Sequence, residues 1–174
     1  SFDEISAVNV LEGGNLVIAG NTRSDIAIAT SGAHDNTING FWDGFVARMN
    51  GTTDRIWGTY FGGSDYDSVN NAVVTSTDRT MVCGRTTSTA GIASAAALQL
   101  TLGGGTDAFL VIFNNTTGAR SYGTYYGGAG DDYGQALCRD EDGNMYLGGH
   151  TESTSGISTP GSHLPVLPAQ PGTT

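Results

Sequence analysis

Acidic residues recur at intervals of about 65 residues along this 174-residue chain, each time just before an apolar run. The recurring residues are Asp3 and Glu4, Asp65 and Asp67, and Asp131 and Asp132. Hard cations such as calcium take several oxygen ligands from such carboxylates, so one interpretation is a calcium site. In the alternative, each carboxylate accepts hydrogen bonds from main-chain amides of a Gly-rich turn and recurs because the turn recurs. Asp65, Asp67, Asp131 and Asp132 are therefore kept as candidate ligand-binding residues, with no metal site assigned.

Trp42 is the second candidate for ligand binding. It is the only Trp in the long polar segments of the chain, where an indole ring can stack on a ligand ring or pack against the protein. His34, His150 and His163 do not show the spacing of metal ligands within one element. No Ser has an identifiable base, and the Gly-Gly pairs precede strands rather than helices, so they are not phosphate cradles. We therefore predict a protein that is not an enzyme and that needs no cofactor unless calcium binds.

Composition excludes several other classes of function. The net charge of −10 would repel the phosphate backbone, so no nucleic-acid binding is expected. No run of apolar residues is long enough to span a membrane. Cys83 and Cys138 occupy repeat positions that mostly hold apolar residues, which predicts two small core side chains. A disulfide between them remains open, because it depends on how close neighbouring sheets come.

The candidate residues lie within three copies of one repeated sequence pattern. Residues 58–63 read Gly-Thr-Tyr-Phe-Gly-Gly and residues 123–128 read Gly-Thr-Tyr-Tyr-Gly-Gly, while residues 15–22 return as 80–87 and 144–151. Each copy contains short runs rich in Val, Ile, Phe and Tyr between turn residues, which indicates strands. We expect strands near 5–11, 15–20, 44–50 and 55–61, repeated with the period to give ten. The recurring aromatic residues are expected to pack between units.

The fold that we predict is all-β: a β-propeller repeat array of four-stranded antiparallel blades, with about two and a half blades present. The blade repeats are 1–63 and 64–128, followed by 129–174 as the first half of a third. A β-sandwich is the alternative, but it does not require similar strands every 65 residues. Long loops at about 23–42, 87–106 and 152–174 should share one face, where they either bind a partner or shield blade edges.

The motifs resemble the SBBP β-propeller repeat of bacterial secreted proteins. The resemblance is carried by Gly-Thr-Tyr-Tyr-Gly-Gly-Ala-Gly-Asp-Asp-Tyr-Gly at 123–134, Asp-Gly-Asn-Met-Tyr-Leu-Gly at 142–148 and Asp-Ala-Phe-Leu-Val at 107–111. The segment 28–34 and its echo 157–163 look like the versions found in Bacteroidota. The resemblance implies an extracellular or outer cell-surface location, and export by a type IX system with a link to gliding motility.

We therefore predict a noncatalytic scaffold or adhesion module that mediates protein–protein or surface interactions. The alternative is a lectin-like propeller that binds glycans on its long-loop face. Since the third unit stops halfway, we expect a segment of a longer array rather than one of several chains that complete a ring. Its partners would be further repeats of the same parent chain or other protein chains, and the segment alone should aggregate or oligomerise.

Overall fold

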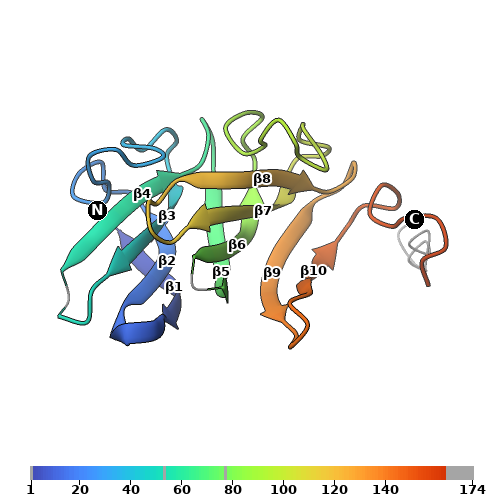
Figure 1. Cartoon of the computed structure of the whole chain (residues 1–174). Helices are drawn as coiled ribbons and strands as arrows, with labels where there is room; N and C mark the ends of the chain where they lie inside the picture. Colours follow the sequence, from blue (N-terminus) through green and yellow to red (C-terminus); the bar gives the residue numbers. More distant parts are fainter. Residues whose placement is uncertain (1, 53, 77, 164–174) are drawn as a thin grey trace.

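The computed structural model describes residues 2–52, 54–76 and 78–163 (Figure 1). These residues form three antiparallel sheets and one short 3-10 turn at Glu12–Gly14, with no α-helix. Sheet I contains β1 (Asp3–Val10), β2 (Leu16–Thr22), β3 (Asp43–Met49) and β4 (Arg55–Phe61). Sheet II contains β5 (Asp67–Ser76), β6 (Arg79–Thr86), β7 (Asp107–Asn114) and β8 (Arg120–Tyr126), and sheet III contains β9 (Asp132–Arg139) and β10 (Met145–Thr151). The all-β prediction is confirmed, and the ten strands lie within about three residues of their expected positions.

Strands are joined in sequence order, so each four-stranded sheet is an antiparallel meander. The β1–β2, β7–β8 and β9–β10 turns are short, and each has a Gly with positive φ where the chain reverses: Gly13, Gly118 and Gly143. At the β9–β10 turn, Gly143 has φ 88° and Asn144 N–H donates to Asp140 Oδ1 at 2.8 Å. This segment is a hairpin turn, as its sequence predicts, and the Asp140 carboxylate is used within it.

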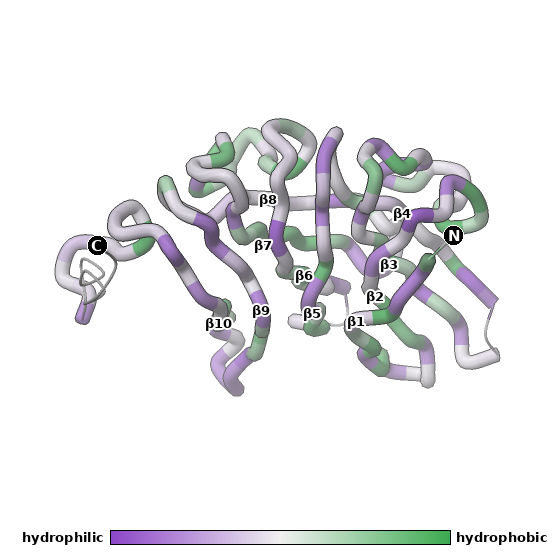
Figure 2. The backbone as a smooth tube through the Cα atoms, turned by 180° about the vertical axis from the view of Figure 1, so that it is seen from behind, coloured by the Kyte–Doolittle hydropathy of each residue, from purple (hydrophilic) through white to green (hydrophobic). Residues whose placement is uncertain are grey.

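The sheets stand side by side, with sheet II between the other two (Figure 1). The first strands follow one another, because β1 lies against β5 and β5 against β9 (Figure 2). The long loops 23–42 and 87–106 and the described part of the third loop gather on one side, at the top of Figure 1. The β1–β2 and β9–β10 turns and the adjoining ends of β5 and β6 lie on the opposite side. Residues 164–174 of the predicted third loop are outside the described residues.

Three glycines in the second strands establish how the repeats correspond. A Cβ on Gly20, Gly84 or Gly149 would lie about 2 Å from the main-chain oxygen of Glu4, Ser68 or Tyr133, respectively. These three positions are therefore equivalent, and Thr22 corresponds to Thr86 and Thr151. The sequence comparison placed the middle copy at 80–87, one residue too late. The correct range is 79–86.

The first core cluster fills the space between sheets I and II. Val17, Ala19 and Phe61 of sheet I are buried against residues that include Phe109 and Phe113 of sheet II. Phe61 contacts both Phe rings, with centroids 5.1 and 5.8 Å apart. Burying several such side chains, each worth about 1.5–3 kcal/mol, stabilises the contact between neighbouring sheets.

The recurring Tyr residues also lie in the interior. Tyr60 and Tyr125 are almost fully buried, and their hydroxyls donate to the main-chain oxygens of Ser24 and Ser88, both at 2.8 Å. Tyr126, next to Tyr125, is only partly buried. The aromatic residues thus contribute to the core, while the two Tyr hydroxyls anchor the loops that follow β2 and β6.

The two cysteines differ, and one expectation about them is wrong. Cys83 is buried in a second cluster between sheets II and III, and burial raises the pKa of its thiol to about 12. Cys138 is exposed on sheet III, and both thiols are free. The sequence comparison aligned Cys83 with Ile18 and Leu147. In the corrected register, Cys83 corresponds to Ala19 and Gly148. Cys138 was expected in a core, but the side of sheet III on which it lies has no neighbouring sheet among the described residues.

Candidate functional site

The candidate residues Asp67 and Asp132 begin the first strands of sheets II and III and are buried. Gly63 N–H and Ser88 Oγ donate to Asp67 Oδ2 at 2.7 and 2.8 Å. Gly128 N–H and Ser153 Oγ donate to Asp132 Oδ2, both at 2.7 Å, and Thr151 Oγ1 donates to its other oxygen. Each carboxylate thus connects the Gly-Gly turn before its own strand with residues at the end of the second strand of the same sheet. This agrees with the interpretation in which each Asp stabilises a repeated Gly-rich turn.

A second set of buried carboxylates, which sequence reasoning did not select, begins the third strands. Asp43 accepts from the main-chain N–H groups of Asn39 and Gly40, at 2.9 and 3.2 Å. Asp107 accepts from Gly103 and Gly104 in the same way, at 2.8 and 3.1 Å. The signal was present, since both Asp residues begin the repeated segments that read Asp-Gly-Phe and Asp-Ala-Phe.

The two sets approach each other at the Gly-Gly turns. A Cβ on Gly62 would lie 2.8 Å from carboxylate atoms of both Asp43 and Asp67, and one on Gly127 would crowd Asp107 and Asp132. Burial, with the nearby Asp67 charge adding to it, raises the pKa of Asp43 to about 6. Burial also raises the pKa of Asp67 and of Asp107. Close carboxylates with raised pKa values can serve in catalysis, but these are covered and hydrogen-bonded to the protein.

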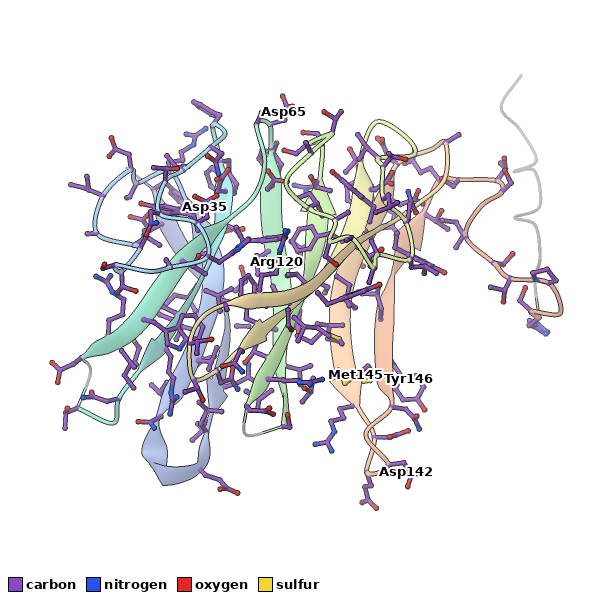
Figure 3. The ribbon with its side chains drawn as sticks, turned by 45° about the horizontal axis from the view of Figure 1, so that its top comes forward. Asp35, Asp65, Arg120, Asp142, Met145 and Tyr146 are labelled. Carbon is purple, nitrogen blue, oxygen red and sulfur yellow. The ribbon has the colours of Figure 1, made fainter. Side chains whose placement is uncertain are left out.

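The remaining acidic candidates lie nearer the surface. Asp65 is exposed at the tip of the connection between sheets I and II, where it projects from the molecule (Figure 3). Asp131 is half-buried and accepts from Thr106 N–H at 3.0 Å. Among the described residues, no group of three or more His, Cys, Asp or Glu side chains is placed to hold a metal ion. The calcium expectation therefore has no ligand set in this part of the chain.

Trp42 lies in a stack of aromatic rings. Its ring stacks on Phe2 at 5.3 Å and on Tyr66 at 6.0 Å, and the Arg23 guanidinium lies 4.9 Å from its centroid. Its indole N–H is buried and has no hydrogen-bond partner among the described residues. Protein groups already cover the ring, so Trp42 acts as a packing residue between the segments that lead into sheets I and II.

The stack continues across sheet II to sheet III. The Arg85 Cζ lies over the rings of Tyr66 and Tyr133, at 5.3 and 5.4 Å from their centroids. Tyr133 in turn stacks on His150, with centroids 4.4 Å apart and an interplanar angle of 18°. We call Trp42, Tyr66, Arg85, Tyr133 and His150 the stacked row. It links all three sheets on the side of the long loops.

A groove of about 630 Å³ lies beside the end of this row, between sheets II and III. Its lining residues, which define the II–III groove, are Asn70, Arg85, Tyr133, Gln135 and His150. All five carry a polar group, and none is acidic. Gln135 Nε2 and His150 Nδ1 are 3.2 Å apart, and Asn70 Nδ2 donates to the Gly134 oxygen at 2.7 Å. The groove therefore offers hydrogen-bonding groups of both kinds and one cation.

Sequence reasoning missed the groove because its residues lie on four different strands. One signal was available in the repeat itself. The position of Arg85 holds Asn21 in the first unit and His150 in the third, and the position of Tyr133 holds Glu4 and Ser68. Positions that differ among otherwise similar repeats are not dictated by the shared fold, so they are where one interface can acquire its own chemistry.

Comparison with known proteins assigns no family. No protein-family model matches the chain, and no curated protein matches it significantly. Within the described residues, no helix is both long and apolar enough to cross a membrane.

Proposed function

We propose that the chain is a noncatalytic β-propeller segment that serves as an interaction scaffold or adhesion module in a secreted or cell-surface bacterial protein. The observation that carries the proposal is the outward face of sheet I, on the side away from sheet II. On that face, sheet I carries apolar residues at the positions equivalent to those by which sheet II packs on sheet I. The extracellular setting rests on the resemblance of the repeated motifs.

Equivalent residues of β1 and β5 have opposite environments. Ile5, Val8 and Val10 are 58%, 57% and 72% exposed. Their equivalents in β5 are Val69, Ala72 and Val74, as the shared strand register shows. Val69 and Ala72 are buried against sheet I, and Val74 packs beside them. The outward face of sheet I thus has the pattern of a docking face, and the occupant that fits it is a further four-stranded unit of the same repeat.

Apolar volume on this face agrees with that occupant. A groove of about 330 Å³ is lined by residues that include Ile5, Ile18, Phe45 and Met49. Ile18 and Phe45 correspond to Val82 and Phe109, which fill the contact between sheets I and II. An apolar face of this kind favours a covering partner, because leaving it in water forfeits about 25 cal/mol for each Å².

Asn side chains add specificity to the contact between units. Asn21 Nδ2 donates to the Val69 oxygen at 2.9 Å, and Asn21 Oδ1 accepts from Val69 N–H at 2.6 Å. Asn9 donates to the Ala72 oxygen and accepts from Val74 N–H, at 2.9 and 3.3 Å. Such bonds from β1 and β2 fix the position of β5 against sheet I, which an apolar contact alone does not do.

The noncatalytic part of the proposal is supported by the state of the carboxylates. The buried Asp residues of both sets accept hydrogen bonds from turns and hydroxyls, and the one oxygen without such a partner among the described residues, Asp67 Oδ1, is buried away from solvent. Adhesion and scaffolding need docking surfaces rather than reactive groups, and the repeat supplies such surfaces.

The test is a fusion in which a copy of residues 65–129 is joined directly before Ser1. Asp3 then follows the Gly-Gly pair of the copy at the spacing with which Asp132 follows Gly127 and Gly128. We expect the added unit to cover β1, to raise the melting temperature and to reduce association seen by light scattering. A matched fusion with Val8→Asp and Val10→Asp should lose these gains. A 174-residue chain that is already a cooperatively melting 17.9-kDa monomer, unchanged by the fusion, would overturn the proposal.

A second candidate function is binding of a saccharide, as the lectin-like alternative expects. The observation in its favour is the II–III groove rather than Trp42, whose ring is occupied by protein neighbours.

A further inference from the structure

The II–III groove differs in charge from the chain that forms it. The chain has a net charge of −10 and seven arginines, yet the groove is lined by one of those arginines, one His and no acidic residue. Its volume of about 630 Å³ lies within the range of roughly 300–1,000 Å³ that is usual for ligand pockets. Local positive charge in an acidic protein selects for an anionic ligand over a neutral one.

Arg85 is placed to hold a carboxylate. Its guanidinium carbon lies 5.3 and 5.4 Å from the ring centroids of Tyr66 and Tyr133, so both rings contact the cation. Its one hydrogen bond among the described residues is long, from Nη2 to the Tyr66 hydroxyl at 3.4 Å. Among the described residues, the ion pair that is found joins Arg79 to Asp78. Arg85 therefore has no carboxylate partner among these residues. Because that hydrogen bond is long and no carboxylate of the described residues pairs with Arg85, its other guanidinium N–H groups can donate to the two oxygens of a bound carboxylate.

The other groups in the groove suit hydroxyl groups. The Asn70 and Gln135 amides and the His150 imidazole can both donate and accept, as sugar hydroxyls do. His150 ends the stacked row, and its exposed ring leaves one face without a stacked neighbour among the described residues. The C–H face of a pyranose ring can lie on such a face, because the ring carries negative charge density there. A peptide would more typically require apolar pockets, and no apolar side chain lines this groove.

We propose that the II–III groove binds a saccharide that contains a uronic acid, with the sugar carboxylate on Arg85 and a pyranose ring beside His150. The inference does not depend on the scaffold role, since the groove lies between two sheets that both belong to this chain. It rests on the second candidate function, saccharide binding, and names the class of saccharide.

Isothermal titration of the 174-residue chain with galacturonic acid trimer tests the proposal. Binding should weaken as salt is raised, and the methyl ester of the same trimer and a neutral galactose trimer should bind at least tenfold more weakly. Arg85→Gln should lower the affinity for the galacturonate trimer about 10- to 100-fold, because a charged hydrogen bond is lost. His150→Ala, on an exposed residue of the outer sheet, should lower it several-fold without unfolding the chain.

Arg79→Gln is the matched control, because it removes the same charge from the same strand outside the groove. Its affinity should equal that of the unmodified chain. Melting curves of the variants show whether a loss of binding reflects a loss of structure. No binding of the trimer, equal binding of its methyl ester, or equal losses in Arg79→Gln and Arg85→Gln would each refute the proposal. Tighter binding of a tripeptide with a free C-terminus than of the trimer would refute the saccharide as the source of the carboxylate.

Discussion

Gly84→Ala should be among the most damaging small substitutions in this protein. A Cβ at Gly84 would lie 1.8 Å from the Ser68 main-chain oxygen and 2.8 Å from Phe109 Cζ. Ordinary contacts begin near 3.4 Å, so β5 and β6 would have to move apart by more than about 1 Å. The oxygen belongs to a paired strand, and side-chain rotation cannot relieve the contact.

The magnitude follows from two contributions. Forcing an extra methyl group into a packed site costs about 1–3 kcal/mol. Separating the strands also weakens about two ladder hydrogen bonds, each worth roughly 1 kcal/mol. The free energy of unfolding should therefore fall by about 3–5 kcal/mol. At about 2–4 °C for each kcal/mol in a chain of this length, the melting temperature should fall by about 6–20 °C.

Thermal melts followed by circular dichroism at fixed protein concentration measure this effect, with the concentration held constant because association would add to the apparent stability. Gly148→Ala is the matched control, since the nearest atoms to its added Cβ lie at 3.8 and 4.0 Å. It should be neutral or slightly stabilising, because Ala restricts the unfolded chain. Gly149→Ala, whose Cβ would lie 1.9 Å from the Tyr133 oxygen, should behave like Gly84→Ala. If Gly84→Ala melts within about 2 °C of Gly148→Ala, our account of the close approach of these strands is wrong.

Three further predictions concern buried side chains. Tyr125→Ala should lower the free energy of unfolding by about 3–5 kcal/mol and Tyr125→Phe by about 1–3 kcal/mol. Tyr126→Phe should lower it less than either. Urea titrations that rank these three variants otherwise would contradict the buried position of Tyr125. Burial raises the folded-state pKa of Asp43 from 3.8 to about 6, so its contribution to stability is complete below pH 3.8 and is lost as pH rises through 6. The fall in the urea midpoint from pH 5 to pH 7 should therefore be smaller in Asp43→Asn, and an equal fall in both proteins would rule this effect out. A thiol reagent should label Cys138 rapidly at pH 8 and leave Cys83 unmodified until the chain unfolds, and labelling of both at one rate would show that the second cluster is open.

The orientation of β10 illustrates how much the alternating pattern predicts. Met145 and Tyr146 point to opposite sides of the strand (Figure 3). Met145 packs into the cluster between sheets II and III, whereas Tyr146 is 53% exposed. Strand geometry places neighbouring residues on opposite sides, but both of these residues are apolar, so the sequence does not say which side is covered. That depends on which face a neighbouring sheet covers.

The one-residue error in the middle repeat has a similar cause. Thr86 and Thr87 are neighbours, so either can be matched to Thr22, although only the match of Thr86 also aligns Gly84 with Gly20. In a strand, a shift of one residue exchanges the two faces, and it therefore assigned Cys83 to the wrong face. The contact between Gly84 and the Ser68 oxygen resolves the ambiguity, because it shows why Gly, and not only Thr, must be aligned at this position.

By itself, the sequence determined the all-β class, the number and places of the strands, the turns and the period of the repeat. Those properties depend on local preferences: β-branched and aromatic residues in short runs, with Gly and Asn where the chain reverses. The tertiary structure decided which faces are buried, which carboxylates are covered, and that Arg85, Tyr133 and His150 meet beside one groove. These properties depend on contacts between residues far apart in the chain, and such contacts form only when the sheets pack against one another.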